Sequence, residues 1–83
     1  MSTQAHTLGD ANTRATEYLR QRVALSDANP GELAERVGKY RAFFYLRLAG
    51  ERQWRANDLD LLADALRVPK ADLWFGVSRA VAS

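Results

Sequence analysis

Apolar residues recur at helical spacing along most of the chain. Ala15, Leu19 and Val23 stand at i, i+4 and i+8, which places them on one face of a helix that starts near Asn12 or Thr13. None of the chain alternates apolar and polar residues as a half-buried strand does. The pattern therefore predicts an all-α fold of five short helices. The four later helices are expected at 30–37, 40–49, 57–66 and 69–75.

Two central helices have clear start and stop signals. Asn29 can cap the first of them, Pro30 suits its first position, and Glu32 completes a capping box. Gly38 is expected to end this helix in a left-handed conformation, and Gly50 to end the next one. Two short helices joined by a tight turn that contains glycine are typical of a helix-turn-helix.

The first twelve residues hold few large apolar side chains and several Ser, Thr, Gly and Asn, so we expect a flexible tail there. Trp54 is expected to be a buried plug in the connection after the central helices. The fourth helix is predicted to begin at Asn57, with Asp60 three residues later, and the last helix to end at Gly76. The expected organisation is a tail at 1–12, a domain at 13–76 and a tail or helix extension at 77–83.

Length and composition exclude several classes of protein. A chain of 83 residues with 47% hydrophobic residues is one small domain. It has no run of about 18 apolar residues, no recognisable signal peptide and no cysteine. The single histidine, His6, lies in the predicted tail, so the chain lacks a plausible catalytic or metal-binding group. We expect a cytoplasmic protein that is not an enzyme and needs no cofactor, metal or small-molecule ligand.

The positive charge is concentrated on the central helix pair. Residues 36–55 carry six basic side chains against one acid, a balance of +5. The rest of the chain carries six basic and nine acidic side chains, a balance of −3. Such a local excess of positive charge is expected of a surface that binds a polyanion.

The central helix pair contains an LAxxxG step that ends at Gly38 and a twelve-residue interval between Gly38 and Gly50. On these features the sequence resembles the Cro/repressor-type, lambda-repressor-like (XRE-like) helix-turn-helix family over about residues 13–75, and it is most similar to repressors of actinobacteria and their phages. The matching residues are Leu33, Ala34, Glu35, Arg36, Val37, Gly38, Phe44, Leu48, Gly50, Glu51, Arg52, Asp58, Leu59, Leu62, Ala63, Leu66, Val68 and Leu73.

The resemblance implies a transcriptional regulator of phage or prophage type, acting on the nucleoid or in an infected cell. In that family the helix corresponding to 40–49 enters the major groove of an operator, and many members bind as dimers. The sequence departs from the family at two points. Pro30 stands where Gln often contacts phosphate, and Tyr40 stands where Ser or Thr is usual.

The predicted DNA-contacting residues lie on and beside the helix at 40–49. Arg41 at its tip is expected to bind guanine, whereas Ala42, Phe43 or Leu46 would pack on thymine methyls. Basic and tyrosine side chains around them would contact phosphates. The full set is Lys39, Tyr40, Arg41, Ala42, Phe43, Tyr45, Leu46, Arg47, Arg52 and Arg55.

Two alternatives remain open from the sequence. Phe43, Tyr45 and Leu46 are also compatible with a core or interface position. The same fold could instead bind a protein, such as a toxin or host factor, through Ala42, Phe43, Leu46 and Ala49. At the C-terminus, Leu73 and Trp74 could complete the core. Alternatively, a homodimer contact is predicted at Trp74, Phe75 and Val77.

Overall fold

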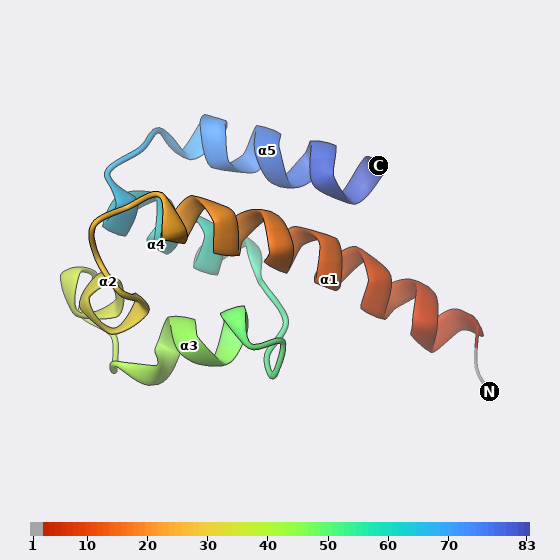
Figure 1. Ribbon diagram of the computed structural model, residues 1–83, viewed down its shortest axis with the longest axis horizontal. Coiled ribbons are helices and arrows are strands. Elements are labelled where there is room, and N and C mark those ends of the chain that lie inside the picture. Colours follow the sequence, from red (N-terminus) through yellow and green to blue (C-terminus); the bar gives the residue numbers. More distant parts are fainter. Residues whose placement is uncertain (1–2) are drawn as a thin grey trace.

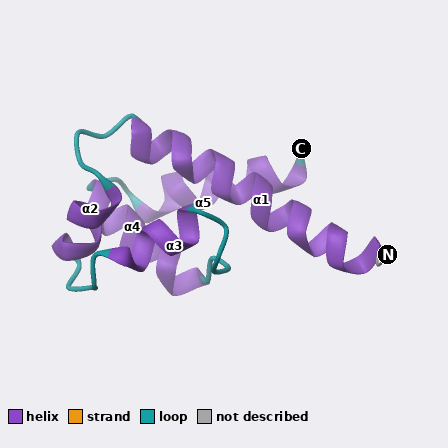
Figure 2. Ribbon diagram, turned by 60° about the horizontal axis from the view of Figure 1, so that its bottom comes forward, coloured by secondary structure: helices purple, strands orange, loops and turns teal. Residues whose placement is uncertain are grey.

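Five α-helices make up the computed structural model, which describes the backbone of residues 3–83 and the side chains from residue 10 onward. They are α1 (Thr3–Ala24), α2 (Pro30–Arg36), α3 (Ala42–Leu48), α4 (Ala56–Leu66) and α5 (Lys70–Ala82). None of residues 3–83 forms a strand, so the predicted all-α fold is confirmed. α1 and α5 lie side by side and run in opposite directions (Figure 1), while α2, α3 and α4 gather near the C-terminal end of α1 (Figure 2).

Each helix contributes one fully buried large side chain to a single core. The five residues have no exposed surface, and burial of such a side chain is worth about 1.5–3 kcal/mol relative to exposure. The apolar stripes predicted for the helices are therefore the faces that meet in the core. The five residues are Leu19, Leu33, Phe44, Leu62 and Leu73.

The first central helix begins where its sequence signals predicted, and both central helices end at the predicted glycines, but α3 begins at Ala42, two residues after the predicted start at Tyr40. The Asn29 side chain accepts a hydrogen bond from the Glu32 amide, and Glu32 accepts one from the Asn29 amide, each at 2.9 Å. Gly38 and Gly50 have φ angles of +73° and +82°, as left-handed caps require. The amide of the residue after each glycine donates a hydrogen bond to a carbonyl in the last turn of the helix, so each helix ends in a hydrogen-bonded C-terminal cap.

The predicted start of the first helix was wrong. α1 begins at Thr3 rather than near Asn12 or Thr13, so the predicted tail at 1–12 is helical from Thr3, and its first two residues lie outside the described range. No proline interrupts residues 3–24, and the single glycine costs only about 1 kcal/mol in a helix. A scarcity of large apolar residues was therefore not enough to break the helix.

The last helix does not end at Gly76, because α5 continues through it to Ala82, as the alternative of a helix extension at 77–83 predicted. The residues 77–83 accordingly extend the helix. A Cβ atom built on Gly76 would overlap the Tyr18 hydroxyl of α1. Gly76 therefore allows two antiparallel helices to approach closely instead of ending one of them.

The start and end of α4 differ from the expected pattern. α4 begins at Ala56, and its cap is formed by Asp58, whose Oδ2 accepts the Arg55 amide at 3.0 Å; the predicted Asn57 and Asp60 cap was wrong. At its end Arg67 has φ +62°, the one left-handed residue other than glycine among the described residues. A side chain with a Cβ is strained in that conformation.

Candidate nucleic-acid interface

The outward face of α3 is formed by residues one turn apart. Ala42, Tyr45 and Ala49 are exposed and Leu46 is half-buried, whereas Phe44 and Leu48 on the opposite face are buried. Of the ten residues predicted to contact DNA, seven are exposed and Leu46 is half-buried. The seven exposed residues are Lys39, Tyr40, Arg41, Ala42, Tyr45, Arg52 and Arg55.

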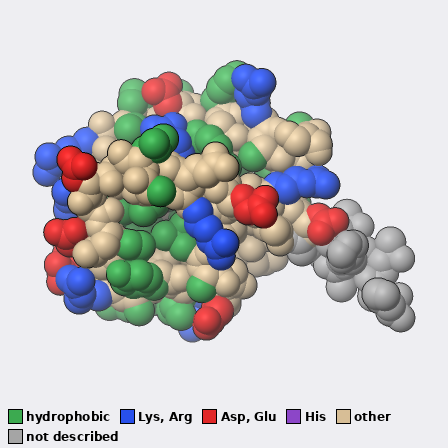
Figure 3. All heavy atoms as spheres, viewed as in Figure 1, with side chains coloured by type: hydrophobic (Ala, Val, Ile, Leu, Met, Phe, Trp, Pro, Cys, Tyr) green, Lys and Arg blue, Asp and Glu red, His purple; other side chains and the backbone are tan. Residues whose placement is uncertain are grey.

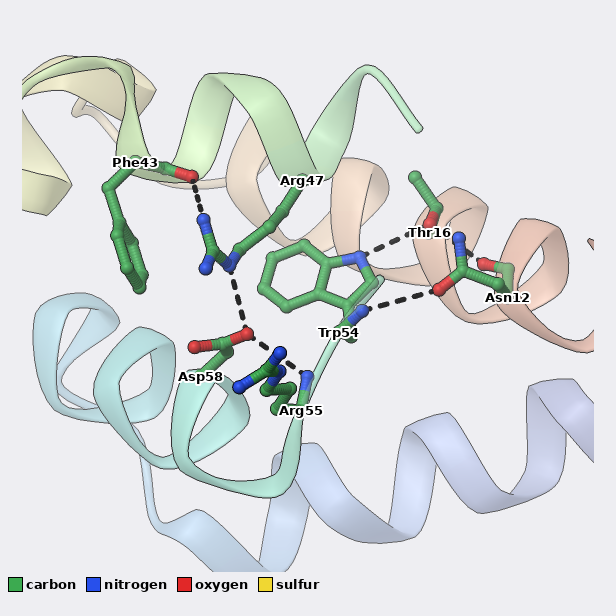
Figure 4. Close-up of polar contacts among 7 residues, drawn as sticks. All are labelled: Asn12, Thr16, Phe43, Arg47, Trp54, Arg55 and Asp58. Carbon is green, nitrogen blue, oxygen red and sulfur yellow. Dashed lines mark hydrogen bonds and ion pairs between the residues drawn. The ribbon is translucent and has the colours of Figure 1, made fainter. Parts of the chain in front are cut away.

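Arg47 is turned away from this face. Its Nε donates to Asp58 Oδ2 at 2.9 Å and its Nη1 to the Phe43 carbonyl at 2.9 Å (Figure 4). The Arg47 and Asp58 side chains are only 13% and 6% exposed. The structure therefore does not support the predicted phosphate contact of Arg47, since this guanidinium joins α3 to the first turn of α4.

Phe43 is also buried, contrary to its predicted place among the DNA-contacting residues. Its ring is 7% exposed, and the Arg47 guanidinium lies 3.7 Å from the ring centroid. Tyr40 and Phe44 contact the same ring edge-on, with centroids 5.6 and 5.1 Å away. Phe43 therefore belongs to the core side of α3, which was one of the two positions that the sequence left open.

Trp54 fixes the segment that follows α3. Its ring stacks on Phe44 at 6.3 Å between centroids, and its indole N–H donates to the Thr16 hydroxyl at 3.1 Å. Its backbone amide donates to the Asn12 side chain at 3.3 Å (Figure 4). The predicted role of Trp54 as a plug is confirmed in part, because the ring is packed against the core but only half-buried. These contacts hold Trp54, in the segment between α3 and α4, against α1.

Two other arginines cap helices instead of lying free on the surface. The Arg20 Nε donates to the Leu48 carbonyl at the end of α3, at 2.7 Å. Arg36 donates to the Ala65 carbonyl near the end of α4, at 2.9 Å. A cation at a helix C-terminus satisfies an open carbonyl and the negative end of the dipole. Sequence spacing could not indicate these roles, because the partners are 28 and 29 residues away.

Arg41 lies at the N-terminal tip of α3 and is half exposed. Its Nη1 is 3.0 Å from Glu35 Oε2, and both side chains are 56% exposed. The hydrogen bond that Arg41 donates to Glu35, followed by the negative charge of Glu35, raises the pKa of Arg41 above its ordinary value, so this side chain stays cationic. Arg41 therefore presents a fixed positive charge beside the outward face of α3.

The charge around α3 comes from exposed side chains. Five of the six basic residues between 36 and 55 are exposed, Arg47 being the exception. Figure 3 shows hydrophobic side chains gathered over the part of the molecule where Figure 1 draws α3, with Lys and Arg side chains and also Asp and Glu side chains at their edges. The surface combines a small apolar centre with a charged rim that carries these basic side chains.

The C-terminal helix carries a second apolar surface. Leu73 is fully buried, as the core interpretation predicted, but Trp74 and Phe75 are 38% and 64% exposed and Val77 is half-buried against the core. The Trp74 indole donates to Asp60 at 2.8 Å. Trp74 therefore does not complete the core, and together with Phe75 it remains available for a contact between molecules.

Other chemistry has little support in the described part of the chain. There, no three or more His, Cys, Asp or Glu side chains come together as a metal site would require. No helix of the described residues combines the length and apolar character of a membrane span. Comparison with known proteins finds no matching family model, no similar curated protein and no similar solved structure.

Proposed function

We propose that the protein is a sequence-specific DNA-binding regulator of the repressor/Cro type that places α3 in the major groove of an operator. The observation that carries this proposal is the set of exposed basic residues around α3, which are Lys39, Arg41, Arg52 and Arg55. Basic side chains of the charged rim would neutralise phosphates, while the central helix would lie against base edges. An α-helix fits the major groove.

The contacts expected from α3 follow from its exposed residues. Arg41 at the tip would donate to guanine, and Ala42 would pack on a thymine methyl. Tyr45, which is 47% exposed, would add a hydroxyl contact. Lys39, Arg52 and Arg55 would contact phosphates. Phe43 and Arg47 are left out of this proposed interface because both are committed to packing within the molecule.

The alternative is a protein-binding module that uses the same face against a toxin or a host factor. The structure weakens this alternative, because Phe43, the largest apolar residue assigned to that surface, is buried. The remaining Ala42, Leu46 and Ala49 offer little apolar area for a protein contact. A homodimer through the exposed Trp74 and Phe75 is compatible with either function.

A salt titration separates the two functions. The equilibrium constant for a labelled duplex is measured by fluorescence anisotropy between about 50 and 200 mM salt. If the three cations Lys39, Arg52 and Arg55 contact phosphates, affinity should fall by about 40-fold over this range. Binding that is absent, or that changes little with salt, would contradict the DNA proposal and favour the protein-binding module.

A further inference from the structure

Gly31 and Glu35 form a seat for the Arg41 guanidinium on the surface of α2. The two residues are four apart in the helix and therefore lie on the same face, one turn from each other. A Cβ atom built on Gly31 would lie 2.6 Å from Nη2 and 2.8 Å from Cζ of Arg41. The guanidinium therefore rests directly on the glycine backbone, and the Glu35 carboxylate holds it at 3.0 Å.

The seat orders Arg41 without enclosing it. The contact with Glu35 involves Nη1, whereas a guanidinium has five N–H donors. With its side chain 56% exposed, Arg41 keeps access to solvent and to a ligand. An arginine that is already ordered loses less conformational entropy when it binds, and a fixed guanidinium plane is more selective about the acceptors that it meets.

We infer that Glu35 is a positioning residue that sets the sequence discrimination of the DNA-binding surface through Arg41. This inference rests on the proposed function. Glu35 has two effects in opposite directions. Its charge repels phosphates and lowers the affinity for all duplexes, while its contact orients Arg41 toward one base pair and favours the matched duplex. Glu35 therefore weakens binding and sharpens specificity at the same time.

The test compares Glu35→Ala with Glu51→Ala. Both variants remove one exposed acid near the basic residues of α3, but Glu51 lies beyond α3 and outside the seat. Affinities are measured by fluorescence anisotropy for two duplexes. The matched duplex has the sequence that the native protein selects. The changed duplex differs from it at one base pair, the one at which Arg41→Ala loses its sequence preference. Both variants should bind the changed duplex about two- to fivefold more tightly, because each lacks one repelling charge.

The variants should differ in discrimination between the two duplexes. Glu35→Ala should lower the ratio of the affinities for the matched and changed duplexes by about three- to tenfold, which is part of the discrimination that a good base contact supplies. Glu51→Ala should leave this ratio unchanged. In an Arg41→Ala background, Glu35→Ala should cause no further loss of discrimination, because its effect passes through Arg41. This double variant distinguishes positioning from a general change in charge.

Two other results overturn the inference in distinguishable ways. If the native protein selects a sequence but Glu35→Ala and Glu51→Ala change discrimination equally, Glu35 does not position Arg41 and only this inference fails. If the native protein binds no sequence preferentially, the proposed function fails and the inference fails with it.

Discussion

Arg41 and Arg47 lie at opposite ends of α3, and each is paired with a carboxylate at nearly the same distance. The pair of Arg41 and Glu35 measures 3.0 Å, and the pair of Arg47 and Asp58 measures 2.9 Å. Their surroundings are very different. The first pair is 56% exposed on both sides, whereas the side chains of the second are 13% and 6% exposed.

Burial gives the two arginines different roles. Water screens an exposed pair, so it contributes little to stability, and the N–H donors of its guanidinium that the carboxylate does not use can bind a further acceptor. A buried pair has given up its hydration, so loss of one partner leaves an uncompensated charge. The structure therefore places Arg47 among the residues that stabilise the fold, and it leaves Arg41 exposed at the start of α3 for the proposed contact with DNA.

The largest effect is expected where the buried pair is broken. Asp58→Ala should lower the free energy of unfolding by about 3–5 kcal/mol, because Arg47 would remain buried without its partner. The same change removes the acceptor of the Arg55 amide at the start of α4. Urea denaturation followed by circular dichroism measures the effect. A loss below about 1 kcal/mol would mean that water reaches Arg47 and that the contrast between the two pairs is incorrect.

The next largest effect is on binding. Arg41→Ala should lower the affinity for a selected duplex by about tenfold or more and relax preference at one base pair, because a guanine contact is lost. Its urea midpoint should match that of the native protein. Anisotropy with matched and changed duplexes measures the result, and unchanged affinity and preference would show that α3 is oriented differently on DNA.

A third arginine provides a comparison without an ion pair. Arg67 ends α4 with φ +62°, where glycine is unstrained. Arg67→Gly should raise the free energy of unfolding by about 0.5–1 kcal/mol, since relief of left-handed strain outweighs the added freedom of the unfolded chain. Urea denaturation checks this value, and a decrease would show that the Arg67 side chain has a stabilising contact.

The smallest effect on stability is expected when the exposed pair of Arg41 and Glu35 is broken in the absence of DNA. Glu35→Ala should leave the urea midpoint unchanged, because the pair that it removes is screened by water. Asp58→Ala serves as the comparison in the same experiment. If Glu35→Ala destabilised the protein as much as Asp58→Ala, the seat on α2 would be structural and Arg41 would not be available for binding.

The features that were predictable from the sequence are local ones. The cap of Asn29 and Glu32 and the stops at Gly38 and Gly50 depend on residues within one or two turns, so a short stretch of sequence contains all the participants. The core stripe of α1 was predictable for the same reason. Helical periodicity is a property of a single segment.

The features that were missed depend on residues distant in sequence. Arg47 is buried because Asp58 meets it from the next helix, and Gly76 continues a helix because Tyr18 of α1 lies against it. Single-segment reasoning cannot place such partners. For the same reason, the buried character of Phe43 became clear only when α2, α3 and α4 were packed together.

Selection of duplexes from a random DNA pool at near-physiological salt, with the native protein and Arg41→Ala side by side, tests the central claim most directly. We expect the native protein to enrich one sequence, either a short site or an inverted repeat with half-sites one turn apart. Arg41→Ala should enrich a related sequence with one relaxed position. If the native protein enriched no sequence, α3 would not be a DNA-reading helix, and a protein partner for its outward face would become the leading explanation.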